Sequence, residues 1–155
     1  MQKRNRVRPV VLAVSSGGGH WVQMRRLAPA FFGADLHYAT TDRSAADQVG
    51  AGRLHVYPDA NKDTPLRLLL CVARLTWIVL RLRPDVVVST GAAGGFLAIR
   101  LARLIGARTM FIDSIANARA LSVSARLSMG VADRVLSQWP HVAAKTGAEY
   151  RGAVI

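Results

Sequence analysis

The chain has 155 residues, 51% of them hydrophobic, with a mean hydropathy of +0.21 and a formal net charge of +12. This length suits one domain with a real core, and the lone Cys71 excludes an internal disulfide. The 18 arginines among 21 basic residues predict attraction to an anionic surface, either membrane lipid or nucleic acid. The basic arm at residues 1–8 has no apolar signal core, so we expect a protein on the cytosolic side.

The first predicted unit is a buried strand at residues 10–14, a tight turn and a helix at 22–27. The turn reads Ser15-Ser16-Gly17-Gly18-Gly19-His20. Glycines permit positive φ and leave no Cβ between a ligand and the first N–H groups of the helix. Such a helix N-terminus attracts anions, so we expect the turn to bind a diphosphate. His20 is the only side chain of the turn that can move a proton near neutral pH, which makes it a candidate general base.

Other interpretations of this turn stay open at this point. The turn lacks the Gly-Lys-Ser/Thr ending of nucleotide-hydrolase phosphate loops. Gly17 and Gly19 fit a dinucleotide-binding fingerprint, but Val22 occupies the third glycine position. Asp42 lies just beyond the next predicted strand, where it could bind a ribose. The glycines could also serve only a sharp corner between strand and helix.

The rest of the chain alternates between strand and helix patterns. Strands are predicted at 34–40, 53–57, 85–90, 108–113 and 133–137, and helices at 42–49, 65–82, 96–105 and 122–129. Residues 60–64 and 114–120 are predicted loops, 91–95 a second small-residue turn, 138–140 a turn, and 150–155 a last strand or the start of another segment. This alternation predicts an α/β fold with an open, mostly parallel, Rossmann-like sheet and helices on both faces. Residues 16–20, 91–95 and 113–117 should then line one crevice beyond the carboxyl ends of the strands.

The long apolar segment at 66–82 is too short and too charged to span a bilayer. Its three arginines would each cost about 2.5–3.5 kcal/mol at the bilayer centre. They recur every seven residues and so share one helical stripe: Arg67, Arg74 and Arg81. The apolar positions away from that stripe include Leu70, Trp77, Ile78 and Val79. This pattern suits a helix lying in the membrane interface, or a core helix with its arginines in water. The two interpretations can both hold in part, because one flank can pack on the sheet while the other contacts lipid.

Four motifs occur in an order that resembles a known family. They are Ser15-Ser16-Gly17-Gly18-Gly19-His20, Ser89-Thr90-Gly91-Ala92, Ile112-Asp113-Ser114 and Ala132-Asp133-Arg134-Val135-Leu136-Ser137-Gln138-Trp139-Pro140. The chain resembles the membrane-associated subunit of split GT-B glycosyltransferases, over nearly its whole length. One branch is the eukaryotic asparagine-linked glycosylation protein that helps add the second N-acetylglucosamine to dolichol-diphosphate. The other is the bacterial PssD-type exopolysaccharide subunit.

The resemblance implies the N-terminal half of a MurG-like enzyme, so we expect residues 1–155 to form a single acceptor-binding domain. Such a domain receives a polyprenyl-diphosphate-linked sugar acceptor, while a separate donor-binding subunit holds most of the UDP-sugar. The expected product carries N-acetylglucosamine or a related hexose, in polysaccharide or lipid-linked oligosaccharide synthesis. We expect a heterodimer, inactive without its partner and peripheral on an anionic membrane surface at the cytoplasmic face. The eukaryotic members begin with a membrane-spanning helix that these 155 residues lack.

Site residues follow from the motifs and the resemblance together. The catalytic candidates are His20 and Asp113. The acceptor and diphosphate candidates are Ser16, Gly17, Gly18, Gly19, Gly91, Ala92, Gly94, Ser114 and Asn117. The membrane-contact candidates are Arg67, Arg74, Trp77, Ile78 and Arg81.

Several roles stay open among these candidates. His20 could bond the diphosphate or cap the helix instead of acting as a base. Asp113, which stands where relatives often carry glutamate, could orient the acceptor sugar, act as the base or contact nearby amides. Since no metal-ligand spacing occurs, we expect neither a metal nor a cofactor.

Two other function classes compete with glycosyl transfer. A dinucleotide-binding Rossmann reductase would use Asp42, but no Tyr-Lys or Cys pair for such a reaction is recognisable. A nucleic-acid-binding module would use the +12 charge, but the basic residues are scattered and form no aromatic-basic platform, so we expect no nucleic-acid partner. The other histidines, at 37, 55 and 141, are predicted to be structural or solvent-exposed.

Overall fold

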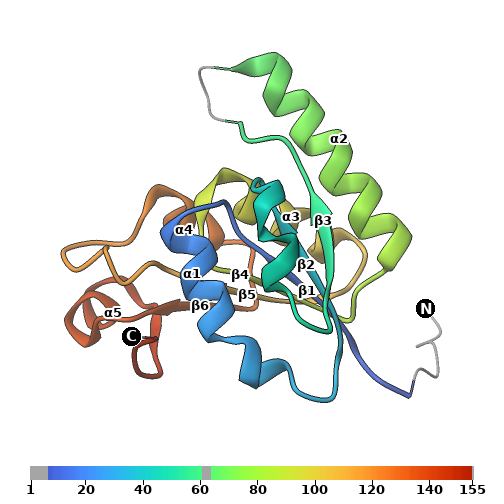
Figure 1. Ribbon diagram of the computed structural model, residues 1–155. Coiled ribbons are helices and arrows are strands. Elements are labelled where there is room, and N and C mark those ends of the chain that lie inside the picture. The colour runs from blue at the N-terminus through green and yellow to red at the C-terminus, as the bar shows by residue number, and fades with distance from the viewer. Residues whose placement is uncertain (1–6, 61–63, 155) are drawn as a thin grey trace.

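The computed structural model describes residues 7–60 and 64–154, and in them seven parallel strands form one sheet of order β3-β2-β1-β4-β5-β6-β7 (Figure 1). The strands are β1 (Val10–Val14), β2 (Asp35–Thr40), β3 (Arg53–Val56), β4 (Val86–Ser89), β5 (Arg108–Ile112), β6 (Arg134–Ser137) and β7 (Glu149–Tyr150). The chain order reverses between β1 and β4, which is where open α/β sheets place their ligands. The predicted α/β fold is confirmed.

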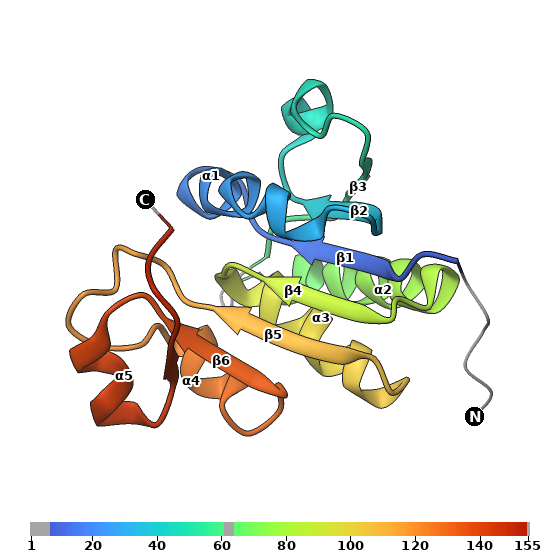
Figure 2. The ribbon, with the colours of Figure 1, turned by 90° about the horizontal axis from the view of Figure 1, so that it is seen from below.

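Helices cover both faces of the sheet (Figure 2). The α-helices are α1 (Gly19–Arg26), α2 (Pro65–Leu82), α3 (Ala92–Leu104), α4 (Val123–Ser128) and α5 (Pro140–Thr146), with 3-10 helices η1 (Ala28–Phe31) and η2 (Arg43–Gln48). Figure 2 shows α1 on one face of the sheet and both α2 and α3 on the other. Among the described residues, no helix combines the length and the apolarity that crossing a membrane requires.

Strand β1 forms the centre of the core because its alternate side chains pack on opposite faces. Leu12 and Val14 belong to the apolar cluster that includes Leu75 and Ile78 of α2. Ala13 faces the other way, in the cluster that includes Trp21 and Met24 of α1. All five residues of β1 are buried, as a continuous apolar run in a parallel sheet predicts. The turn that follows β1 is therefore held between two packed helical layers.

Helix α3 begins at Ala92, so the predicted turn at 91–95 is too long: residues 92–95 already form the first turn of the helix. A Cβ on Gly94 would lie 2.5 Å from the Tyr57 ring, and one on Gly95 would collide with the Ser89 hydroxyl. These two glycines let the first turn of the helix pack closely on neighbouring elements. They look like turn residues in the sequence because small size serves both purposes.

The C-terminal part of the chain contains a helix that the sequence analysis missed. The expected turn at 138–140 leads directly into α5, where Pro140 stands at the first helical position. Proline is well suited there because the lost N–H would have no partner in the helix. The predicted last strand is confined to Glu149–Tyr150. The first six residues of the basic arm, and residues 61–63 of the predicted loop 60–64, lie outside the described residues.

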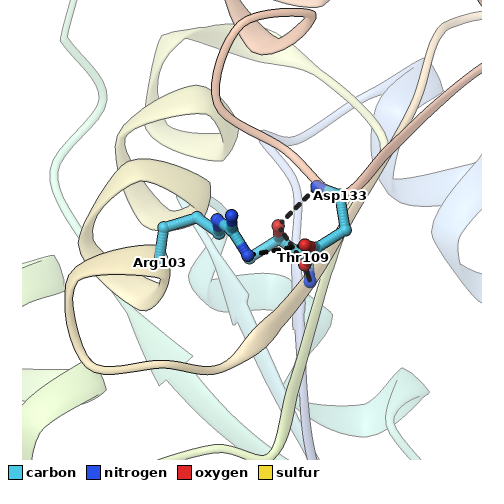
Figure 3. Close-up of polar contacts among 3 residues, drawn as sticks. All are labelled: Arg103, Thr109 and Asp133. Atoms are coloured by element: carbon cyan, nitrogen blue, oxygen red, sulfur yellow. Dashed lines mark hydrogen bonds and ion pairs between the residues drawn. The ribbon is translucent and has the colours of Figure 1, made fainter.

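Asp133 fixes the amino-terminal ends of β5 and β6 to α3 (Figure 3). Its Oδ2 accepts hydrogen bonds from the Thr109 backbone N–H at 2.7 Å and the Thr109 hydroxyl at 3.1 Å. Its Oδ1 pairs with the Arg103 guanidinium, and its own N–H donates to Thr109 Oγ1 at 3.0 Å. These contacts lie at the opposite end of the strands from their carboxyl termini. Asp133 therefore stabilises the fold and lies away from the predicted crevice.

Candidate functional site

The structure brings the three predicted crevice segments together at the carboxyl ends of β1, β4 and β5. The Thr90 hydroxyl, just after β4, donates to the His20 carbonyl at 2.8 Å. The Gln23 side chain of α1 donates to the Asp113 carbonyl, just after β5, at 3.3 Å. Residues from three separated parts of the chain therefore form one polar region at the point where the strand order reverses.

The glycine turn after β1 presents the uncapped N-terminus of α1 to this polar region. Gly18 precedes the helix with φ of 63°, a value that L side chains rarely adopt. The Gly17 N–H donates to the Thr41 hydroxyl at 3.0 Å, which ties the turn to the end of β2. Within the described part of the chain, no side chain caps this end of α1. Binding of an anion by its first N–H groups stays a prediction, which the absence of a side-chain cap from the described residues allows.

Helix α3 presents a second N-terminus beside the first. Gly91 has φ of 143° and Ala92 has φ of 64°, an unusual value for a residue with a side chain. A left-handed alanine costs about 1–2 kcal/mol, so the surrounding structure holds this turn in place. The backbone of 92–94 supplies the first N–H groups of α3, which no side chain caps among the described residues. Diphosphate contact by Ala92 and Gly94 stays a prediction for these N–H groups.

His20 lies between the two helix N-termini. Its Nδ1 is 2.8 Å from the Ser16 hydroxyl oxygen, and a Cβ on Gly91 would lie 2.5 Å from its Nε2. Burial lowers the pKa of His20 below its usual value, and the nearby Asp113 charge partly opposes this shift. The imidazole is therefore neutral at pH 7 and able to accept a proton.

The Ser16 hydroxyl also bears on which nitrogen of His20 is basic. It can donate to the Gly17 carbonyl, at 3.4 Å, while accepting from His20 Nδ1–H. This assignment leaves the lone pair on Nε2, the nitrogen that faces Gly91. Ser16, predicted to contact the diphosphate, is thus placed to orient His20 as well.

Asp113 is held by the loop that follows it. The carboxylate is buried, with Oδ1 accepting from the Asn117 amide and Oδ2 from the Ser122 N–H, each at 2.9 Å. Among the roles left open for Asp113, the geometry favours contact with nearby amide groups. Ser114 accepts a local bond from the Ala116 N–H at 3.2 Å. Acceptor contact by Asn117 and Ser114 stays a prediction, and both already serve the loop.

Four residues that sequence reasoning did not assign to the site hold this same loop. Gln138 donates to the Asp113 carbonyl at 2.8 Å and accepts from the Val154 N–H at 2.7 Å. The Trp139 indole donates to the Ile115 carbonyl at 2.7 Å, and His141 Nε2 lies 2.6 Å from the Ala118 carbonyl. Gln23 completes the set from α1. The signal in the sequence was the polar Gln138-Trp139 pair directly after a buried strand.

A comparison with protein-family models identifies the family. Residues 62–154 match the model described as "Oligosaccharide biosynthesis protein Alg14 like". The chain belongs to this Alg14-like family. The match includes Gly91, Asp113 and the Ala132–Pro140 block, so the predicted resemblance is confirmed. No curated protein matches the chain.

Solved structures match the fold of this Alg14-like chain. MurG of Acinetobacter baumannii gives a TM-score of 0.70 at 18% identity, over 86% of this chain and 43% of MurG. UDP-N-acetylglucosamine 2-epimerase of Rickettsia bellii gives 0.67 at 11%, over 95% and 46%. MnaA of S. aureus, solved with UDP, gives 0.67 at 12%, over 88% and 39%. The chain thus spans less than half the length of these proteins, and at such identities the likeness shows the fold alone.

Family membership favours glycosyl transfer over the dinucleotide-binding alternative. Asp42, the expected ribose ligand of a reductase, accepts bonds from the Ser44 N–H at 2.9 Å and the Ser44 hydroxyl at 2.7 Å. These bonds lower its pKa and cap η2. Asp42 therefore has a structural role in this Alg14-like chain. His37 and His55 likewise bond each other at 2.9 Å, as expected of structural histidines.

Helix α2 exposes a different apolar face from the predicted one. Ile78 and Val79 are fully buried in the core, so the expected membrane contact of Ile78 is wrong. These two residues share a helical face with Cys71 and Leu75, which pack on the sheet. We define the outer face of α2 as its exposed large apolar side chains: Leu66, Leu69, Leu70, Trp77 and Leu80. The three predicted arginines are exposed along one flank, where the Arg74 guanidinium lies 4.7 Å from the Trp77 ring centroid.

Proposed function

We propose that this chain is the acceptor-binding subunit of a glycosyltransferase. The enzyme would move a sugar, N-acetylglucosamine or a related hexose, from a UDP-sugar to a polyprenyl-diphosphate-linked acceptor. Membership of an oligosaccharide biosynthesis family and a fold like one half of MurG support this class of reaction. A separate subunit would bind the donor, as the resemblance to the membrane-associated subunit of split GT-B enzymes implies.

The single observation that carries the proposal is the position of His20 between two uncapped helix N-termini. Two such ends provide N–H groups and partial positive charge for the two phosphates of an acceptor. A neutral imidazole held beside them can act on the hydroxyl of the sugar that the diphosphate carries. An anion site and a base thus occur together at the end of the sheet where ligands bind.

The proposed reaction is one nucleophilic substitution at the anomeric carbon of the donor. The acceptor hydroxyl oxygen forms the new bond to that carbon while the bond to the UDP oxygen breaks. UDP leaves with the electron pair, and His20 Nε2 takes the hydroxyl proton. An alcohol is a weak nucleophile until its proton has an acceptor, so this transfer is worth about 10²–10⁴ in rate. Asp113 favours the protonated imidazole electrostatically, because its charge raises the pKa of His20.

The outer face of α2 supports attachment to a membrane surface in the proposed function. The leucines of this face and Trp77 are each at least half exposed, and three arginines flank them. Apolar side chains below the headgroups and guanidinium groups at the phosphates suit a helix lying in the interface. A lipid acceptor at the cytosolic face would then reach the crevice without leaving the membrane.

Reconstitution with a donor-binding subunit tests the proposed function. We expect the purified chain alone to transfer no sugar from UDP-sugars to a polyprenyl-diphosphate-linked acceptor. Adding a subunit with the fold of a GT-B C-terminal domain, encoded by the same organism, should restore turnover. Full turnover by the isolated chain would remove the two-subunit proposal, and no turnover with any UDP-sugar in the complex would remove glycosyl transfer.

A further inference from the structure

A groove of about 550 Å³ lies between the carboxyl ends of β2 and β3 and the N-terminal half of α2. We call it the side groove. Its walls are Thr41, Arg43, Val56, Tyr57, Pro58, Asp59, Leu70 and Arg74. Apolar surface from Leu70, Val56 and Pro58 is combined with two guanidinium groups and one carboxylate. The groove therefore offers a mainly apolar wall with an excess of positive charge.

One end of the side groove meets the glycine turn. Thr41, in the groove wall, accepts the hydrogen bond from the Gly17 N–H at 3.0 Å. Tyr57 donates its hydroxyl proton to the Ser15 carbonyl at 2.8 Å, and its ring packs on Gly94 at the start of α3. Two wall residues of the groove thus contact the segments that supply the proposed anion site. The side groove therefore lies directly beside these segments.

The other end of the side groove opens onto the outer face of α2. Leu70 belongs to both, with 54% of its surface exposed. Arg74 closes this side by donating from Nε to the Val56 carbonyl at 3.1 Å, while its guanidinium lies over Trp77. Figure 1 shows this half of α2 projecting beyond the sheet, and none of residues 65–70 is buried. The side groove therefore lies between the residues that contact the glycine turn and the exposed leucines of the projecting helix.

We propose that the side groove binds the first isoprene units of a polyprenyl diphosphate. Leu70, Val56 and Pro58 contact the prenyl chain, while Arg43 and Arg74 face the phosphate nearer to it. The remaining chain leaves over the N-terminal part of the outer face of α2, at Leu66 and Leu69. This inference rests on the proposed function for the identity of the acceptor. It adds a site for the lipid part of that acceptor, with Arg43 as a binding residue.

The combination of charges and apolar surface selects this ligand over other anions. Inorganic diphosphate would bind the helix N-termini and the arginines but leave the apolar wall of the groove exposed to water. A diphosphate joined directly to an apolar chain matches both the arginines and the apolar wall of the side groove.

Calorimetric titration of the full chain with farnesyl diphosphate, inorganic diphosphate and farnesol tests the proposal. Farnesyl diphosphate should bind at least about tenfold more tightly than inorganic diphosphate, since part of the prenyl chain becomes buried. Leu70→Ser should remove most of that difference and leave the affinity for inorganic diphosphate unchanged. Arg43→Gln should weaken both diphosphates by about fivefold to twentyfold, as loss of a charge-assisted contact predicts.

Two matched variants control this experiment. Leu80 lies on the same outer face with 53% exposure but outside the side groove, so Leu80→Ser should leave farnesyl diphosphate affinity unchanged. Arg81→Gln is the matched control for the loss of positive charge: Arg81 lies outside the side groove, so this variant should leave the affinity for both diphosphates unchanged. Equal losses in Leu70→Ser and Leu80→Ser, or equal affinity of the wild type for both diphosphates, would overturn the side groove. The titration measures binding and not sugar transfer, so the two proposals can fail separately. If the chain binds farnesyl diphosphate as expected but is inactive with every partner subunit, the proposed function fails and the side-groove proposal stands.

Discussion

The Ser16 hydroxyl oxygen lies 2.8 Å from His20 Nδ1 and fixes the imidazole between the glycine turn and Gly91. The two residues are four apart, so the contact links the turn itself to the first turn of α1. A hydrogen bond at Nδ1 determines which nitrogen of a neutral histidine is basic. When Ser16 accepts from Nδ1–H, the lone pair is on Nε2, which is the nitrogen that the proposed function assigns to the acceptor proton.

Ser16→Ala should lower kcat of the reconstituted enzyme by about tenfold, the effect of losing one orienting hydrogen bond of about 1.4 kcal/mol. The acceptor KM should change little, because the helix N–H groups still bind the diphosphate. Ser16→Thr keeps the hydroxyl and should restore most of kcat. Nitrogen chemical shifts of His20 provide an independent readout of the Nδ1–H form. A raised KM with normal kcat in Ser16→Ala would instead support the predicted diphosphate contact.

The pH dependence of turnover should show the titration of His20. Proton acceptance needs the neutral imidazole, so kcat should fall as the pH drops through the pKa of this group. Burial lowers that pKa, and the acid limb should lie below pH 6.5. The contribution of His20 to the free energy of unfolding has the same pH dependence, because the unfolded state binds the proton at higher pH than the folded state. This contribution is fully present above the unfolded-state pKa and is lost as the pH falls through the folded-state pKa. An acid limb above pH 7 that persists in His20→Ala would assign the titration to another group.

Gly91→Ala should damage both stability and turnover. The residue has φ of 143°, and an added Cβ would lie 2.5 Å from His20 Nε2. We expect a loss of about 1–3 kcal/mol in the free energy of unfolding, with kcat lowered as the imidazole is displaced. Gly130→Ala is a suitable control because a Cβ there meets nothing within 4 Å, so its effect should stay within about 0.5 kcal/mol. Equal effects of the two substitutions would contradict the packing of His20 on Gly91.

Neighbouring residues of α2 should respond in opposite ways to substitution. Trp77→Ser should weaken the salt-resistant part of binding to anionic vesicles and leave the chain folded, because Trp77 is half exposed. Ile78→Ala should cost about 2–5 kcal/mol of stability, because Ile78 is fully buried. Vesicle sedimentation at low and high salt, with denaturant unfolding of each variant, measures both effects. If Trp77→Ser binds vesicles as well as the wild type does, the outer face of α2 does not contact the membrane.

The fold was predictable because its signals are local and periodic. The apolar run at β1 and the alternation of strands with helices fixed a parallel sheet, and the glycines located one helix N-terminus. Position within a helix was harder to predict: Ile78 is as apolar as Trp77, and only the angle at which α2 meets the sheet buries one of them. Gly94 and Gly95 resembled a turn because close packing also requires small residues.

The polar network of the loop after β5 was beyond sequence reasoning for a different reason. Gln23, Gln138 and Trp139 bond backbone carbonyls of this loop, and any polar side chain at those positions looks solvent-exposed until the chain is folded. Asp113 was a sound choice of residue, since it ends a buried strand. Its two engaged oxygens became apparent only with the loop in place.

An acceptor titration with His20→Ala tests the central claim most directly. The measurement uses the reconstituted two-subunit enzyme at saturating UDP-sugar, with the polyprenyl-diphosphate-linked acceptor varied at several pH values. If His20 takes the acceptor proton, kcat should fall by about a hundred- to ten-thousand-fold, while the acceptor KM stays near the wild-type value. A His20→Ala enzyme with normal kcat and a raised KM would contradict the account, because it would make His20 a ligand of the diphosphate.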